Sequence, residues 1–251
     1  VFIGVSVGVG AAQTPSSPRS LEAIARVTPG LQTALTSQTL RFGSPIYIRI
    51  FKTERELELW VDNGIRYVLF RTYPICTFSG ELGPKLRVGD EQSPEGFYAV
   101  GPSQLNPTSR FHLSFNLGYP NRYDHAHGRT GSALMVHGNC VSIGCYAMTD
   151  TYMEEIYAVA DAALRNGQRA FHVHVFPFRM SPEKIDEYRD SKWHSFWLDL
   201  KVGYDVFEQY GRPPRVGVRN SRYVVTRPSG GRPDTTLQPI RRTQGQSGLP
   251  D

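Results

Sequence analysis

The sequence predicts a mostly β, α+β fold with flanking helices. Glycine and proline are both plentiful, with 24 and 18 residues among 251, which favours a chain that turns often. Short runs between these turns are rich in β-branched and aromatic side chains, as strands are. Apolar residues recur at helical spacing in residues 21–43, 149–165 and 182–210, so helices are expected beside the sheets.

The elements expected in the first half of the chain follow from these patterns. Residues 21–43 predict one or two short helices, because Pro29-Gly30 interrupts the helical spacing. Residues 45–52 predict a strand, residues 54–60 a connecting turn, and residues 66–73 a second strand. Further strands are expected at residues 76–79, 97–100, 111–117 and 133–137.

The second half alternates helices and strands. Residues 149–165 predict an amphipathic helix with acidic residues near its start, and residues 170–176 predict a strand. A second helical pattern covers residues 182–210. Residues 216–226 predict a strand or a hairpin centred on Asn220-Ser221.

The start of the sequence indicates export. Residues 1–12, VFIGVSVGVGAA, form an uncharged apolar run that resembles the end of a secretory signal, with cleavage after Ala12. The run is too short to span a bilayer, and no transmembrane segment is expected in the mature chain. A buried N-terminal strand is the alternative interpretation.

The net charge of +5 says little about the folded part. Much of the excess lies in arginines of the last forty residues, and no recognised nucleic-acid-binding motif is present. Nucleic acid is therefore not expected as a partner.

Residues 134–150, LMVHGNCVSIGCYAMTD, carry the strongest chemical signal. A predicted strand delivers His137 to a glycine turn, and Cys145 follows Gly144 just ahead of a predicted helix. A thiol becomes a useful nucleophile beside an imidazole and at a helix N-terminus. The pattern predicts Cys145 as nucleophile and His137 as general base, although spacing alone equally suits a buried structural cysteine.

Neighbouring residues complete this predicted site. The backbone amides of Gly144, Cys145 and Tyr146 would stabilise an oxyanion, and Ser142 would orient the imidazole or a substrate group.

The order His-Gly-x-x-x-Ser-x-Gly-Cys resembles the active-site signature of the YkuD-type L,D-transpeptidases, and in particular their YafK-like branch. The resemblance covers roughly residues 45–180 in order. Its other motifs are CTFSGELGPK at residues 76–85, GDEQSPEGFY at 89–98, FNLGYPNRYD at 115–124, HGRTG at 127–131 and FPFRM at 176–180.

The resemblance implies a β-sandwich catalytic domain with a Cys–His site, no metal, no cofactor, and substrates bearing diaminopimelate stem peptides. By position, Cys145 matches the family nucleophile and His137 the histidine of the His-Gly step. Two features depart from the common pattern: Ile143 stands where many members have histidine, and the loop before Cys145 is short.

His127 is a rival for the base, because its spacing to Cys145 is nearer that of the longer family loop. His137 is preferred, because it ends a strand whereas His127 lies in a predicted loop. Substrate contacts are also expected from residues around these motifs: Tyr119, Asn121, His127, Arg129 and Tyr146. Arg129 would suit a stem-peptide carboxylate through a bidentate pair.

The expected organisation has five parts. Residues 1–12 are a signal remnant, 13–44 a linker with N-terminal helices, 45–180 the catalytic domain, 181–226 a C-terminal extension and 227–251 a disordered tail.

Cysteine chemistry leaves two further possibilities open. Cys76 and Cys140 would pair in an oxidising compartment and leave Cys145 free, or both stay reduced. A zinc site is a rival interpretation, since several potential ligands crowd together. They are Asp124, His125, His127, His137, Cys140 and Cys145, with a second His-x-His pair at His172 and His174. These two histidines are expected to be satisfied strand residues near the core.

The sequence therefore predicts an exported cell-envelope enzyme that forms a thioester on Cys145 with peptidoglycan stem peptides. An amine acceptor would make it a transpeptidase that forms cross-links or attaches an envelope protein such as a lipoprotein. Water would make it an amidase that cleaves such links. A non-catalytic peptidoglycan-binding module is the alternative of a different class.

Overall fold

The computed structural model describes residues 13–228. The predicted signal remnant at residues 1–12 lies outside the described residues, as does nearly all of the predicted tail. The helices are α1 (Pro18–Ser37), α2 (Arg122–Ala126), α3 (Asp150–Arg165), α4 (Pro182–Glu187) and α5 (His194–Tyr210). Within residues 13–228, no helix has both the length and the hydropathy that crossing a bilayer requires.

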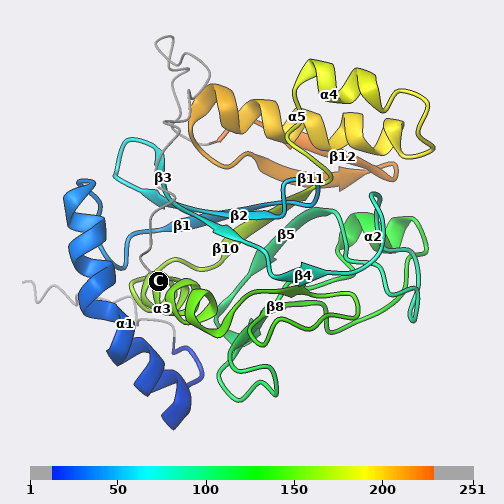
Figure 1. Cartoon of the computed structure of the whole chain (residues 1–251). Coiled ribbons are helices and arrows are strands. Elements are labelled where there is room, and N and C mark those ends of the chain that lie inside the picture. Colours follow the sequence, from blue (N-terminus) through cyan, green and yellow to red (C-terminus); the bar gives the residue numbers. More distant parts are fainter. Residues whose placement is uncertain (1–12, 229–251) are drawn as a thin grey trace, which may run out of the picture.

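One five-stranded sheet forms the middle layer, in the order β3-β2-β1-β10-β5 (Figure 1). Its strands are β1 (Ile46–Phe51), β2 (Glu56–Asp62), β3 (Tyr67–Pro74), β5 (Gly96–Val100) and β10 (Phe171–Phe176). β1 pairs parallel with β10, and the other neighbours pair antiparallel. Both faces are covered, so β1 is buried at every position.

The expected turn at residues 54–60 is wrong. Most of that segment belongs to β2, which pairs with both β1 and β3. Its glutamates hid the strand signal, and the structure explains why they are tolerated there. Glu58 is buried against Arg49 at 2.8 Å, so its charge is compensated inside the sheet.

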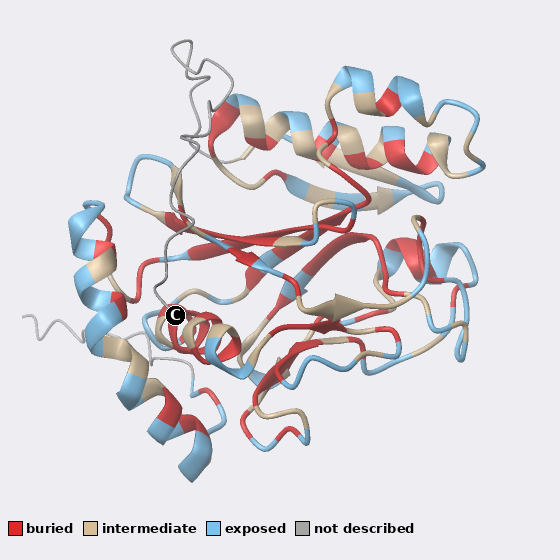
Figure 2. Cartoon of the chain, in the orientation of Figure 1, coloured by how far each residue is buried: buried red, intermediate tan, exposed pale blue. Residues whose placement is uncertain are grey.

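A second sheet of short strands has the order β4-β9-β8-β7-β6. The strands are β4 (Thr77–Phe78), β6 (Leu105–Asn106), β7 (Ser114–Asn116), β8 (Met135–His137) and β9 (Tyr146–Ala147). The main core lies between the two sheets and α3, as the burial colouring shows (Figure 2). The chain therefore has the mixed α+β, predominantly β architecture that the sequence predicts.

α3 begins at Asp150, next to the expected start at residue 149, but it is not adjacent to Cys145. Thr149 is its N-cap and accepts from the Tyr152 amide at 3.3 Å. β9 lies between Cys145 and this helix. The expectation that Cys145 lies at a helix N-terminus is therefore wrong, and the helix dipole does not act on the thiol at close range.

α1 is one continuous helix, although Pro29 was expected to break it. Its apolar side packs on α3, and Ala23, Leu31 and Leu35 are buried. Tertiary packing on both sides of Pro29 outweighs the one backbone hydrogen bond that proline removes.

The C-terminal segment covers the other face of the large sheet (Figure 1). α4 and α5 are followed by a hairpin of β11 (Arg215–Arg219) and β12 (Arg222–Thr226). The hairpin turns at Asn220 and Ser221, both with positive φ, as the sequence predicts. Trp197 of α5 donates to buried Glu95 at 2.8 Å, which ties this segment to the start of β5.

Candidate active site

Cys145 is the free thiol of the three cysteines, because Cys76 and Cys140 form a disulfide with a Cα–Cα distance of 5.3 Å. The disulfide connects the segment before β4 to the loop between β8 and β9. It fixes the first part of the 138–144 loop, where Cys140 N–H also donates to Met148 O, just after β9, at 3.3 Å.

His137 is the last residue of β8, and Cys145 directly precedes β9, the parallel strand beside it. β8 and β9 pair Val136 with Tyr146 and His137 with Ala147. Val136 and Tyr146 are fully buried in the core. Because side chains alternate along a strand, His137 lies on the opposite face of β8 from Val136.

The thiol sits against the start of β8. The Met135 amide donates to Cys145 Sγ at 3.4 Å, and Sγ lies 3.8 Å from Ala133 O. Within residues 13–228, no hydrogen bond joins Sγ to His137. Nucleophile–base contacts are often long without substrate and tighten in the complex.

The tautomer of His137 follows from its backbone contact. Nδ1 lies 2.6 Å from Gly138 O, and a carbonyl only accepts, so Nδ1 carries the proton. Nε2 then has the free lone pair of a base. Phe111 stacks on the ring at 4.7 Å between centroids and fixes its plane.

Both groups are neutral at rest. Burial lowers the pKa of His137, although the Gly138 hydrogen bond opposes this change. Burial raises the pKa of the Cys145 thiol, while the Met135 amide and the positive charge of Lys85 lower it. The two shifts disfavour a preformed thiolate–imidazolium pair.

Serine hydroxyls hold the backbone around Cys145. Ser142 Oγ and Ser93 Oγ donate to Cys145 O at 2.7 and 3.0 Å. Ser79 Oγ accepts from the Gly144 amide at 2.5 Å. Gly144 has a φ of +105°, which other residues rarely adopt.

These contacts revise two expectations. Ser142 bonds the Cys145 carbonyl rather than the His137 ring. The Gly144 amide, expected to face an oxyanion, is occupied by Ser79. The Cys145 turn is therefore positioned mainly by side chains from distant loops.

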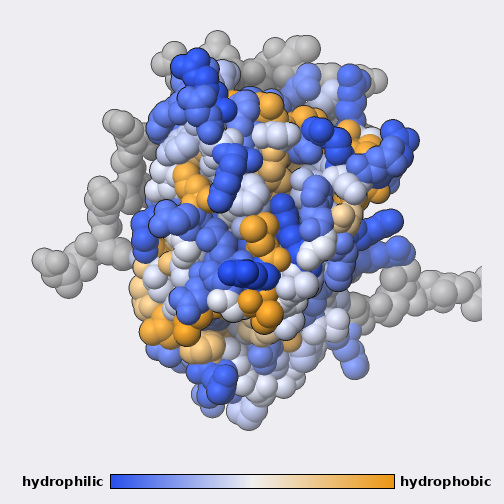
Figure 3. All heavy atoms as spheres, turned by 90° about the vertical axis from the view of Figure 1, so that its right-hand side faces the viewer, coloured by the Kyte–Doolittle hydropathy of each residue, from blue (hydrophilic) through white to orange (hydrophobic). Residues whose placement is uncertain are grey.

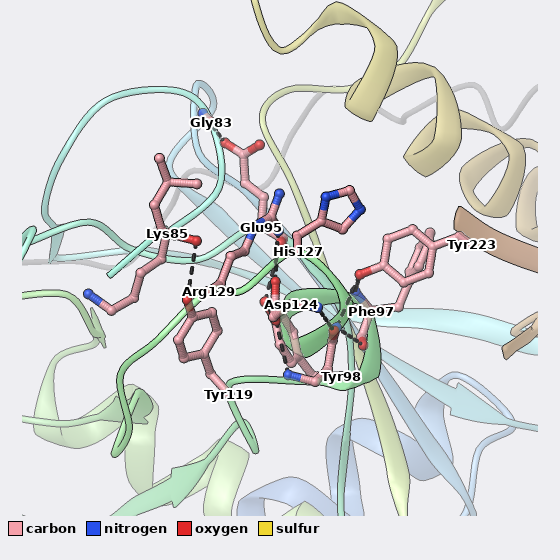
Figure 4. Close-up of polar contacts among 12 residues, drawn as sticks. Gly83, Lys85, Glu95, Phe97, Tyr98, Tyr119, Asp124, His127, Arg129 and Tyr223 are labelled. Atoms are coloured by element: carbon pink, nitrogen blue, oxygen red, sulfur yellow. Dashed lines mark hydrogen bonds and ion pairs between the residues drawn. The ribbon is translucent and has the colours of Figure 1, made fainter. Parts of the chain in front are cut away.

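Apart from Tyr146, the expected substrate residues form a second cluster around α2 (Figure 4). Asn121 caps α2 and its amide nitrogen donates to Phe97 O and Tyr223 Oη at 2.9 and 3.1 Å. His127 Nε2 lies 2.8 Å from Ser221 O and its ring stacks on Tyr123. These contacts hold His127 and α2 against the β11–β12 hairpin.

Arg129 and Tyr146 are buried and already bonded to other residues, so neither is placed to contact a substrate as expected. Arg129 is buried and pairs with buried Asp124 at 2.7 Å. Tyr146 is a core residue whose hydroxyl donates to Pro94 O at 2.8 Å. Tyr119 is buried too, and its hydroxyl donates to Lys85 O at 3.2 Å (Figure 4).

Lys85 is the site residue that the sequence analysis missed. It is nearly fully buried, forms an ion pair with Asp90, and its charge acts on the Cys145 thiol. Only its place within the GELGPK motif marked it in the sequence. Its neighbourhood to Cys145 depends on a loop that folds back across the second sheet.

The zinc alternative lacks a ligand cluster in the structure. Among residues 13–228, no three His, Cys, Asp or Glu side chains are grouped to hold a metal ion. Cys140 is committed to the disulfide and Asp124 to Arg129.

Comparison with known proteins identifies the family. Residues 45–175 match the YkuD family, described as the L,D-transpeptidase catalytic domain. The chain is 52% identical over 186 residues to the putative L,D-transpeptidase YafK of Escherichia coli strain K12, covering 74% of this chain and 76% of the relative. This chain belongs to the L,D-transpeptidase family. It is thus a member of a family of peptidoglycan enzymes.

Two solved structures are similar at lower identity. The helical cell shape determining protein Pgp2 from Campylobacter jejuni aligns with a TM-score of 0.43 and 19% identity, over 71% of this chain. The alignment spans 64% of the length of Pgp2. Bd1075 of Bdellovibrio bacteriovorus aligns with a TM-score of 0.39 and 20% identity, over 72% of this chain and 79% of that protein.

Proposed function

We propose that this L,D-transpeptidase family member catalyses acyl transfer through a thioester on Cys145, using diaminopimelate-containing stem peptides of peptidoglycan. One observation carries the proposal. A lone free thiol lies against the start of β8 at Met135, and the same strand ends two residues later in an imidazole with a fixed Nε2 lone pair. A cell-envelope location, in the periplasm, accompanies this substrate and suits the Cys76–Cys140 disulfide.

The first half of the reaction forms the acyl-enzyme. His137 Nε2 takes the proton from Cys145 Sγ as the sulfur attacks the carbonyl carbon of a stem-peptide amide. The imidazolium then gives this proton to the leaving amine as the C–N bond breaks. Gly138 O stabilises the imidazolium by accepting from Nδ1 at 2.6 Å.

The second half resolves the thioester. An amine of a second stem peptide or of an envelope protein attacks the thioester carbonyl, His137 accepts its proton, and Cys145 leaves. With water in place of the amine, the same steps give a free carboxylate and hydrolysis.

Purified protein incubated with isolated sacculi in H₂¹⁸O tests the proposal. Mass spectrometry of muropeptides is expected to reveal newly joined or released species with wild-type protein and none with Cys145→Ala. Joined products without ¹⁸O identify an amine acceptor, and released products with ¹⁸O in the carboxylate identify water. Equal products from both proteins would contradict the thioester. An unchanged digest with sacculus binding retained would favour the non-catalytic binding module.

A further inference from the structure

A cavity of about 500 Å³ lies between the outer edge of the large sheet and the C-terminal hairpin. It is bounded by β5, β10, the loop before α2, α2 itself and β11. The residues that contact Cys145 in the candidate active site do not line it. Its polar lining residues are Asn121, Arg122, His125, His172 and His174, together with Tyr98 and Tyr223, whose hydroxyls already have hydrogen-bond partners.

His174 brings an unused donor to this cavity. The side chain is fully buried on β10, and its Nδ1 lies 2.8 Å from Tyr47 Oη. Among the described residues, Nδ1 is the hydrogen-bond partner of the buried Tyr47 hydroxyl, so the tautomer that leaves fewer polar groups unmet has the phenol donating to Nδ1 and the imidazole hydrogen on Nε2. Nε2 itself has no hydrogen-bond partner among those residues.

An unmet buried donor is costly, because it has lost its water without gaining a protein acceptor. The His174 ring also stays neutral, since burial lowers its pKa well below 6.5. A ligand that accepts a hydrogen bond from Nε2 would remove this cost without requiring a charged histidine.

The other polar side chains that line the cavity indicate the charge of that ligand. Arg122 and His125 project from the exposed side of α2, and the His172 ring lies 5.8 Å from His174. The Asn121 amide is already used by Phe97 and Tyr223. The lining residues include no aspartate or glutamate. The cavity thus offers donors and one guanidinium and suits an oxyanion.

The apolar residues that line the cavity indicate that the rest of the ligand is apolar. Phe97 lies edge-on to His174, with ring centroids 4.6 Å apart. Leu117 and Pro120 line the cavity from the loop before α2. Val216 and Val218 line it from β11, and the alternation along that strand leaves Arg215 and Arg219 exposed outside.

We propose that this cavity binds a small organic carboxylate, with one oxygen on His174 Nε2 and the charge facing Arg122. The site is separate from Cys145, so the inference goes beyond the proposed acyl transfer. A free organic acid and the C-terminal carboxylate of a short peptide share the required chemistry.

Calorimetric titration of the full chain with benzoate and with a free-acid N-acetyl dipeptide ending in phenylalanine tests the proposal. Saturable binding of at least one acid is expected, with no saturable binding of its neutral counterpart, benzamide or the amide-capped dipeptide. The acid that binds identifies the source of the carboxylate. Absence of binding by both acids, or equal binding of acid and amide, would overturn it.

Three variants locate the bound acid. His174→Asn keeps an acceptor for the Tyr47 hydroxyl but does not reach the Nε2 position, and it should weaken binding about tenfold or more. Arg122→Gln, on the exposed surface of α2, should weaken it similarly without affecting folding. His194→Gln, at the start of α5 outside the cavity, should bind as wild type. Unchanged affinity in both His174→Asn and Arg122→Gln would exclude this cavity.

Cys145→Ala separates the two proposals. It should bind the acid with wild-type affinity while losing acyl transfer. A loss of binding in this variant would place the acid at the active site and contradict a separate cavity.

Discussion

The two sheets of this molecule are built differently, and the difference separates scaffold from chemistry. Strands of the large sheet have five to eight residues, whereas those of the second sheet have two or three. Buried ion pairs lie within the large sheet, such as Arg49–Glu58, and directly at the ends of its strands, such as Lys52–Glu95. The second sheet carries Cys145 and His137, and it depends on loops, serine hydroxyls and a disulfide.

Short strands leave more of the chain in loops, and loops on a rigid scaffold are where binding and catalytic residues concentrate. Figure 3 shows the face at the right of Figure 1, where small hydrophobic patches are separated by polar side chains. Exposed apolar residues of the loops near Cys145 include Leu86, Val88, Val141 and Ile143.

The largest effect is expected from the base on the second sheet. His137→Ala should reduce the rate of acyl-enzyme formation by about 10²–10⁴-fold, because the proposed mechanism passes the thiol proton to His137 Nε2. His127→Ala should only weaken the reaction, since His127 contacts the hairpin. Single-turnover rates with a stem tetrapeptide measure both. A larger loss in His127→Ala would reverse the assignment of the base.

The large sheet should be most sensitive to loss of one buried charge. Lys52 and Glu95 are fully buried 3.1 Å apart, and Glu95 also accepts from Gly83 N and Trp197 Nε1. Lys52→Met should lower the free energy of unfolding by about 3–5 kcal/mol, because the carboxylate is left without its cation.

Denaturant unfolding measures this loss, with Arg189→Met as the control. Arg189 forms an exposed pair with Asp186, and its removal should change stability by about 0–1 kcal/mol. Similar effects for both substitutions would show that the buried pair does not stabilise the scaffold.

The disulfide should matter most to the second sheet. Replacing Cys76 and Cys140 together with serine should lower the free energy of unfolding by about 2–4 kcal/mol, because the bond closes a long loop in the unfolded chain. Reducing the wild-type protein with dithiothreitol should give the same loss, and the double variant should not respond to it. Equal stability of oxidised and reduced wild type would contradict this role.

The smallest effect is expected at Lys85, which acts on Cys145 through its charge. Because burial raises the thiol pKa, the alkylation rate of wild-type Cys145 should still rise with pH through 9.0. Lys85→Met should shift this profile to higher pH, and Lys85→Arg should restore it. A plateau already at neutral pH would instead reveal a preformed thiolate.

The sequence predicted those elements whose pattern is carried by neighbouring residues alone. The strand at residues 170–176, the helix at 149–165 and the turn at Asn220-Ser221 all follow from nearby residues. β2 was missed because Glu58 requires Arg49 on the neighbouring strand. The break at Pro29 was wrong because packing on α3 sustains the helix.

The candidate site likewise has residues that the local sequence predicts and residues that it does not. Cys145, His137 and Gly144 could be identified because their motif is contiguous. Ser79, Ser93 and Lys85 could not, since the chain brings them to Cys145 from about 50–65 residues away. Burial of Arg129 and Tyr146 was equally hidden, because it depends on Asp124 and on the core between the sheets.

Intact-protein mass spectrometry after rapid quenching with a stem tetrapeptide tests the central claim most directly. The account predicts one added acyl group on Cys145 that neutral hydroxylamine removes, as it does a thioester, and no adduct in Cys145→Ala. Product formation by wild type with no adduct on Cys145, or with an adduct on another residue, would contradict it.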